Sequence, residues 1–193
     1  MYYTRKGSGK PLLLLHGWAM HRGVWNDMTA ALAGSFELIA VDLRGHGASV
    51  SLPGPYTFTA FADDIRCLIK NLGLNAVTAV GWSMGVSILL KLFQQPLPLI
   101  DSCIFISGTP SFVTRDDYPC GVPRTVVQRL HRQVSRNYPA GLENFYSLLF
   151  TEEERRALQD SAGYALVVNS RHAPAQAAAL ESLECLAAED LRP

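Results

Sequence analysis

The chain has 193 residues, 48% of them hydrophobic and 18% charged, and its 17 basic side chains balance 17 acidic ones. This composition excludes a disordered tail, and the zero net charge gives no argument for nucleic acid or a membrane surface as a partner. No apolar run approaches the roughly 18 residues that a membrane span needs, and the four cysteines lack metal-ligand spacing, so we expect a cytoplasmic monomer without metal or cofactor.

The first half of the chain alternates short apolar runs with amphipathic segments. In chain order we expect an edge strand at 2–6, a buried strand at 11–15, a helix at 24–33 capped by Gly34, a strand at 37–41 and a helix at 57–72 stopped by Gly73. The run at 11–15 is continuous rather than alternating, which is typical of a strand covered on both faces. The pattern therefore predicts strands joined by helical crossovers.

The most informative stretch runs from Ala76 to Leu90 and reads as a strand, a sharp turn and a helix. The turn, Gly81-Trp82-Ser83-Met84-Gly85, has the G-x-S-x-G pattern of a nucleophile elbow. Its glycines let strand, turn and helix approach closely, and the turn forces the serine into a strained backbone conformation. The pattern predicts that Ser83 stands exposed at a helix N-terminus, where N–H groups stabilise an anion.

The sequence changes character after the elbow helix. Pro96 and Pro98 break the chain, and residues 103–107 predict another short buried strand. From about residue 109 to 188 we expect helices without a further strand, forming a cap over the strand ends of the core at 1–108. Residues 189–193 begin the return to the core. The predicted class is α/β, with a mostly parallel sheet and right-handed crossovers.

A serine hydroxyl is a poor nucleophile near neutral pH and needs a histidine as general base, a carboxylate to orient it, and an oxyanion hole. The donors that we expect for the oxyanion are the backbone N–H groups of Met84, directly after Ser83, and of Trp18 in the loop His16-Gly17-Trp18. We interpret His16 as bracing that loop rather than transferring protons. His46, in another glycine-rich turn, is interpreted as structural too.

Three segments in this order and spacing resemble the α/β-hydrolase family: His16-Gly17-Trp18, Asp42-Leu43-Arg44-Gly45-His46-Gly47-Ala48-Ser49 and the elbow. Within it, the elbow and the later run from Ser107 to Pro119 are similar to carboxylesterases of biotin synthesis, which act on the methyl ester of pimeloyl-acyl-carrier protein. The resemblance covers essentially the whole chain. It implies a serine esterase without cofactor, with the acyl-carrier protein as partner.

The same resemblance implies an acid after a late strand and a histidine near the C-terminus. The chain stops at a point that resembles the start of that strand, so we expect the acid, the histidine and roughly the last three strands to be missing. Asp160 and His172 have the right chain order as an alternative. However, Asp160 does not end a strand and His172 precedes helix-forming sequence. We expect these 193 residues alone to be close to inactive.

The predicted cap carries basic residues without acidic neighbours. No acidic residue lies between Tyr118 and Leu142, a stretch that contains Arg124, Arg129, Arg132 and Arg136. The last three share one helical face, which is either a solvated surface or a docking surface for the acidic carrier protein. The resemblance favours docking, although Leu142-Glu143-Asn144-Phe145 lacks arginines that family members carry there.

Aromatic side chains near the predicted site have two interpretations. Trp82 and Phe145 are our candidates for lining an acyl pocket, although aromatic residues at helical spacing are usually core. Two other functions remain open: a general short-chain esterase or C–C hydrolase of the same fold, and a catalytically dead binding module whose basic face binds an acidic protein.

Overall fold

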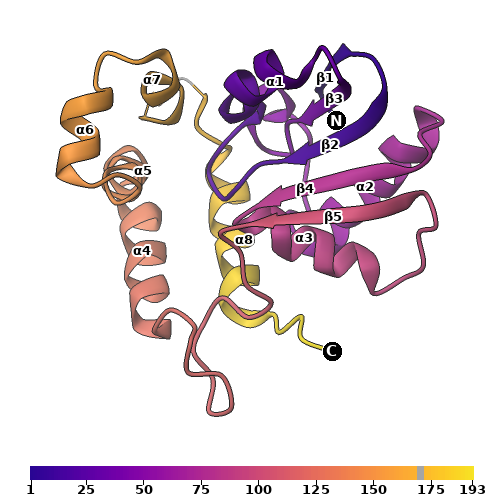
Figure 1. Ribbon diagram of the computed structural model, residues 1–193. Helices are drawn as coiled ribbons and strands as arrows, with labels where there is room; N and C mark the ends of the chain where they lie inside the picture. The colour runs from indigo at the N-terminus through magenta and orange to yellow at the C-terminus, as the bar shows by residue number, and fades with distance from the viewer. Residues whose placement is uncertain (169–171) are drawn as a thin grey trace.

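The computed structural model describes residues 1–168 and 172–193, and a five-stranded sheet lies at its centre (Figure 1). The strands are β1 (Tyr3–Gly7), β2 (Lys10–Leu15), β3 (Phe36–Val41), β4 (Val77–Trp82) and β5 (Ile100–Ile106). Their order across the sheet is β1-β3-β2-β4-β5, with β1 antiparallel to β3 and all other pairs parallel. The predicted α/β class with a mostly parallel sheet is confirmed.

Helices cover both faces of this sheet. The connections hold α1 (Asn26–Leu32), α2 (Phe58–Asn71) and α3 (Met84–Phe93), with short 3-10 turns η1 (Arg22–Trp25) and η2 (Gly47–Ser49). Leu13 and Leu15 of β2 belong to the core on the α2 and α3 side, whereas Leu12 and Leu14 pack with Trp25 on the α1 side. Burial on both faces explains the continuous apolar run of β2.

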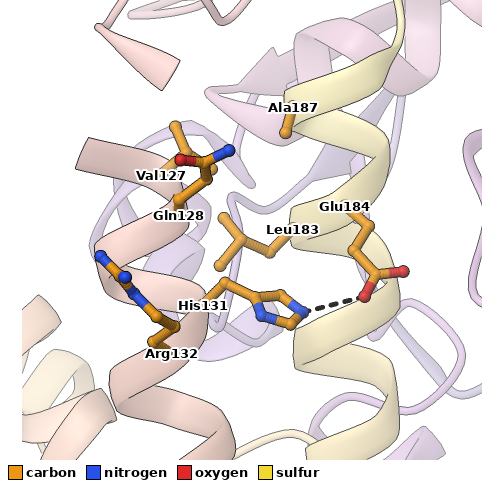
Figure 2. A pocket seen from close by; sticks show the side chains of 7 residues that line it. All are labelled: Val127, Gln128, His131, Arg132, Leu183, Glu184 and Ala187. Atoms are coloured by element: carbon orange, nitrogen blue, oxygen red, sulfur yellow. Dashed lines mark hydrogen bonds and ion pairs between the residues drawn. The ribbon is translucent and has the colours of Figure 1, made fainter. Parts of the chain in front are cut away.

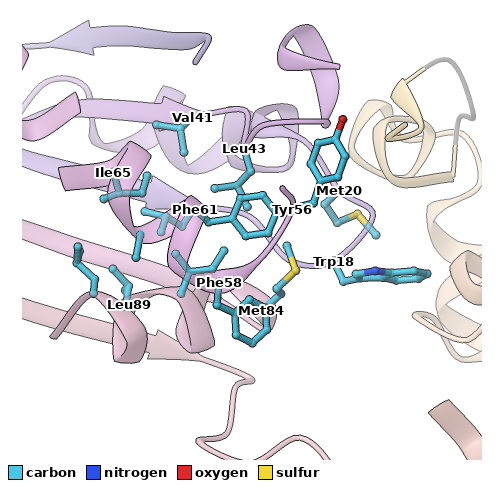
Figure 3. Packing of buried hydrophobic residues seen from close by; sticks show 14 of the residues in the cluster. Trp18, Met20, Val41, Leu43, Tyr56, Phe58, Phe61, Ile65, Met84 and Leu89 are labelled. Carbon is cyan, nitrogen blue, oxygen red and sulfur yellow. The ribbon is translucent and has the colours of Figure 1, made fainter. Parts of the chain in front are cut away.

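The larger core lies between the sheet and the helices α2 and α3. Phe58 and Phe61 of α2 and Met84 of α3 are fully buried in it, and Trp18 extends from its edge toward the later helices (Figure 3). The Thr57 hydroxyl accepts the Ala60 N–H at 3.3 Å and caps α2. The prediction of a helix over 57–72 is therefore confirmed.

In the described part of the chain, five α-helices follow β5: α4 (Arg124–Arg136), α5 (Tyr138–Ser147), α6 (Glu152–Leu158), α7 (Ala162–Val168) and α8 (Gln176–Ala188). Figure 1 shows α4 to α7 standing beside the sheet, with α8 running between them and the core. Ala178, Ala179 and Leu183 of α8 are buried in the same cluster as the strands. The predicted cap, 109–188, includes residues outside the described range, and its separation from the core stays a prediction. No helix in the described parts is long and apolar enough to cross a bilayer.

The predicted start and the predicted C-terminal cap of the first helix are both wrong. The segment 24–33 begins within η1, where the His21 ring accepts the Gly23 N–H at 3.1 Å, and α1 starts only at Asn26. Its C-cap is Ala33 rather than Gly34. Histidine is an unusual N-cap residue, so the start of η1 after His21 is hard to predict from the sequence.

The prediction of a buried strand after the elbow helix is wrong in its burial. Ile104 and Phe105 of β5 are each 49% exposed. Among the described residues β5 pairs only with β4, so it forms an edge of the sheet, and its apolar side chains have few neighbours.

Candidate active site

Ser83 stands at the connection between β4 and α3, as the elbow pattern predicts. Its backbone has φ 53° and ψ −114°, a region that non-glycine residues rarely occupy. The Ser83 N–H donates to the Ile106 carbonyl at 2.9 Å, and the Ser83 carbonyl accepts from Val86 at 2.9 Å. These two bonds hold the strained residue in place.

The elbow glycines permit backbone approach that no side chain would allow. A Cβ on Gly81 would lie 2.7 Å from the carbonyl group of Gly85. A Cβ on Gly85 would lie 2.5 Å from the Leu15 carbonyl oxygen, so α3 packs directly on the end of β2. Close contact with β2 also places the loop after that strand beside Ser83, because a Cβ on Gly17 would lie 3.2 Å from Ser83 Cβ.

His16 fixes the orientation of the peptide that carries the Trp18 N–H. The Leu43 N–H donates to His16 Nε2 at 3.1 Å, so the proton is on Nδ1, which donates to the Gly17 carbonyl at 2.9 Å. Since that carbonyl and the Trp18 N–H belong to one planar trans peptide, holding the first also holds the second. Burial lowers the pKa of His16 well below its usual value and keeps the ring neutral. This agrees with the loop-bracing interpretation.

The predicted oxyanion donors occupy suitable backbone positions. Met84 is the first residue of α3, so its N–H is one of the helix N-terminal groups without a partner in the helix. Trp18 lies in the loop after β2, and the neighbouring Gly17 approaches Ser83. The two predicted donors therefore come from different elements that both adjoin Ser83, and their role as an oxyanion hole stays a prediction.

A cavity of about 170 Å³ opens at Ser83. It is lined by Gly17, Trp18, Met20, Trp82, Ser83, Ser107, Phe145 and Leu149. The structure thus brings together four residues that the sequence singled out from three separate segments: Trp18, Trp82, Ser83 and Phe145. The sequence analysis gave neither Ser107 nor Leu149 a role at the site, because no sequence spacing connects them to Ser83.

A second cavity of about 330 Å³ adjoins the first, and Trp82 and Leu149 line both. Its remaining lining is apolar and comes from distant elements, with Val24, Trp25, Ile106, Phe150 and Val167. Its size and lining suit an acyl chain extending from the nucleophile. No sequence spacing connects these residues, so only the fold reveals the pocket.

None of the described histidines, aspartates or glutamates lines the cavity at Ser83. His16 and His46 are buried and hydrogen-bonded within their own loops. Asp160 is exposed after α6, and the His172 ring lies 4.3 Å from that of His21. The structure therefore does not bring the alternative pair Asp160 and His172 to Ser83.

A buried polar cluster holds the loop after β3. The fully buried carboxylate of Asp42 accepts the N–H groups of Arg22 and Ala48, each within 2.8 Å, and pairs with the Arg22 guanidinium. The His46 Nδ1–H donates to the Arg44 carbonyl at 3.0 Å, while Nε2 has no partner among the described residues. Burial lowers the pKa of His46 to about 4. The His46 ring is therefore neutral near pH 7, which agrees with its interpretation as a structural residue of this loop.

We expect the free energy of unfolding to fall as the pH decreases from about 6.5 to about 4. In this range His46 becomes protonated in the unfolded chain but stays neutral in the folded one, where its pKa is about 4. A pKa difference of roughly 2.5 units corresponds to about 3 kcal/mol. Urea unfolding at several pH values measures this slope for the wild type and for His46→Gln, in which it should be shallower. Equal slopes would contradict the assignment.

The four arginines of α4 are all exposed. With 3.6 residues per turn, Arg129, Arg132 and Arg136 fall within about 60° of one another, opposite the buried Val127 and Val134. Arg124 lies outside this stripe. In the described part of the chain none of the four forms an ion pair. Their charge is therefore uncompensated and turned outward.

A separate groove of about 330 Å³ lies between α4 and α8 (Figure 2). Val127 and Leu183 point into it, and His131 Nε2 meets Glu184 Oε1 at 2.8 Å across it. It shares no lining residue with the cavity at Ser83. The contact ties α4 to α8 and so presents the arginine stripe to solvent. Over the described ranges, no cluster of three potential metal-ligating side chains occurs.

Comparison with known proteins gives a consistent family match. Residues 10–181 match the model of the alpha/beta hydrolase fold family. The pimeloyl-[acyl-carrier protein] methyl ester esterase of Xylella fastidiosa is 31% identical over 197 residues, covering 100% of this chain and 72% of the relative. The enzyme of that name from Nitrosomonas europaea is 31% identical over 78% of this chain and 58% of its own length.

Solved structures agree. An esterase from Exiguobacterium antarcticum superposes with a TM-score of 0.87 at 30% identity, covering 98% of this chain and 70% of the other. A bromoperoxidase from Bacillus anthracis also gives a TM-score of 0.87, at 24% identity and with the same two coverages. The second likeness concerns the fold alone.

Proposed function

Because the chain belongs to the α/β-hydrolase family, we propose that it is a serine carboxylesterase that hydrolyses the methyl ester of pimeloyl-acyl-carrier protein in biotin synthesis. The observation that carries the proposal is Ser83 in its strained elbow, beside the Gly17–Trp18 loop and open to an apolar cavity. The Xylella fastidiosa enzyme named for this substrate matches the whole length of the chain. The proposal includes a cytoplasmic location and action as a monomer.

In the proposed reaction the Ser83 hydroxyl oxygen attacks the ester carbonyl, and the N–H groups of Trp18 and Met84 stabilise the resulting oxyanion. The tetrahedral species collapses, the C–O bond to the methoxy group breaks, and a proton converts the leaving group to methanol. Water then adds to the acyl-enzyme and releases the free acid. Trp82 and Phe145 contact the acyl chain, which extends into the adjoining apolar cavity.

The proton transfers need a base, and no described histidine or carboxylate lines the site. We therefore propose that residues 1–193 alone retain only the roughly 10³- to 10⁴-fold catalysis over water that an oxyanion hole and substrate binding provide. A high protein concentration makes this residual rate measurable.

The test compares two methyl esters of pimelate, one on the carrier protein and one on a simple thiol, with p-nitrophenyl butyrate as a third substrate. Mass spectrometry follows conversion of each methyl ester to the acid. We expect the carrier-bound ester to have the highest kcat/KM. Equal values for the carrier-bound and thiol-bound esters would reject the carrier-specific function. They would favour a general short-chain esterase, the alternative that the similarity to the Exiguobacterium esterase supports.

The exposed arginines of α4 give a prediction about carrier binding. Changing both Arg129 and Arg136 to alanine should raise the Kd for the acidic carrier about tenfold at low salt, and added salt should shrink the difference. Calorimetric titration with the pimeloyl-carrier methyl ester measures this without turnover.

The matched control changes Arg5 and Arg156, which are exposed but paired with Glu37 and Glu152. Its Kd should stay within twofold of the wild-type value. The same loss in both double variants would mean that net charge, rather than the α4 stripe, governs binding. Unchanged binding in the α4 variant would favour the interpretation of the stripe as a solvated face.

A further inference from the structure

The loop that carries the Trp18 N–H is a tight turn with an unfavourable residue in it. The Met20 N–H donates to the Gly17 carbonyl at 3.2 Å, which closes a turn over residues 17–20. Ala19, the third residue of that turn, has φ 58°. A type II turn requires this positive φ and prefers glycine there, because Cβ crowds the backbone. The turn therefore benefits from support outside itself.

Tyr146 of α5 supplies such support. Its phenolic O–H donates to the Ala19 carbonyl at 2.9 Å, and both residues are buried. The bond joins segments 127 residues apart in the chain. It acts on the carbonyl of the strained residue itself, so it favours the turn conformation over a flipped peptide.

Trp18 is held from the same side of the molecule. Its indole N–H donates to the Ala179 carbonyl of α8 at 2.9 Å, and the Phe145 ring meets the Trp18 ring edge-on at 4.6 Å between centroids. Figure 3 shows Trp18 extending from the core toward these helices. Two consecutive turn residues are thus fastened to α5 and α8, whereas the first residue of the turn is fastened by His16.

We propose that Tyr146 is a positioning residue for the oxyanion hole. Its bond to Ala19 keeps the turn in the conformation that orients the Trp18 N–H, so the position of α5 against this turn determines how well the oxyanion is stabilised. This rests on the proposed function, in which that N–H stabilises the oxyanion. Tyr146 itself does not line the cavity at Ser83. Its ring and backbone contact the lining residues Phe145 and Leu149, whereas its hydroxyl bonds to Ala19. Its effect therefore acts through the turn.

The experiment compares Tyr146→Phe with Tyr138→Phe. Tyr138 is a matched control, since its phenol also donates to a backbone carbonyl, that of Pro174, from the same helix but away from the turn. We measure residual hydrolysis of p-nitrophenyl butyrate, because that rate depends on the oxyanion hole and binding. We also measure hydrogen exchange at the Met20 amide, whose bond closes the turn.

Tyr146→Phe should lower kcat about tenfold with KM within twofold of wild type, and should speed Met20 exchange about tenfold. Tyr138→Phe should change neither. The inference is overturned if Tyr146→Phe keeps kcat within twofold, or if Tyr138→Phe produces the same losses through general loosening of the helices. A failure of the proposed function looks different: the wild type then shows no hydrolysis above buffer, and the inference falls with it. An unchanged kcat in an active protein refutes the inference alone.

Discussion

We expect added imidazole to raise the protein-dependent rate of p-nitrophenyl butyrate hydrolysis by residues 1–193 about tenfold, measured above a protein-free reaction at the same imidazole concentration, and we expect Ser83→Ala to remove this increase entirely. The reason is that the proposed site holds Ser83 and the turn that carries the Trp18 N–H, while no described base lines its cavity of about 170 Å³. A positioned general base contributes roughly 10²- to 10⁴-fold, and a diffusing imidazole recovers a small part of that. The increase should follow the concentration of neutral imidazole as the pH is varied.

Ser87→Ala is the control, since Ser87 is buried one turn further along α3 and has no assigned role. It should respond to imidazole as the wild type does. A Ser83→Ala protein that still responds would show that Ser83 is not the nucleophile. Fast hydrolysis without imidazole that depends on Ser83 would instead show that this chain contains its own base, contrary to the expectation from its sequence.

Gly85→Ala should destabilise the protein by about 3 kcal/mol or more, because the new methyl group meets the backbone of β2 rather than a movable side chain. It would lie 2.5 Å from the Leu15 carbonyl oxygen and 3.2 Å from that of His16. For a chain of this length the melting temperature should fall by about 10 °C. Thermal and urea unfolding measure the effect.

Gly34→Ala is the matched control for that substitution. A Cβ at Gly34 meets nothing within 4 Å, and its φ is not positive. It should leave the free energy of unfolding unchanged or raise it by about 0.5 kcal/mol, since alanine restricts the unfolded chain. If Gly85→Ala were equally harmless, α3 would not pack on β2 as closely as described.

The local features of the site were predictable because each has a local cause. The elbow requires glycines around Ser83, and those glycines interrupt otherwise regular strand and helix patterns. The strand at 11–15 is apolar at every position because both its faces are covered. Amphipathic spacing predicted α2 because one of its faces is buried, and the helix ends at Asn71, two residues before Gly73 with its positive φ of 62°.

The features that could not be predicted from the sequence depend on contacts between distant segments. The apolar sequence of β5 predicts burial, yet burial is decided by what lies beside a strand, and the described residues supply only β4 on one side. The bond from Tyr146 to Ala19 spans 127 residues and has no sequence signature. The adjoining pocket likewise draws Trp25, Ile106 and Val167 from separate elements.

The exposed edge of β5 also affects the tendency of the protein to self-associate in solution. Ile104, Phe105 and Ile106 are exposed apolar residues on a strand that, among the described residues, pairs only with β4, and such an edge is a template onto which another polypeptide can add. Concentrated stocks should therefore self-associate and scatter light well before the fold itself melts. Since Ile106 also lines the apolar pocket, we expect such association to restrict access to that pocket. A specific activity that declines as the protein is concentrated would then indicate self-association through the β5 edge rather than a change at Ser83.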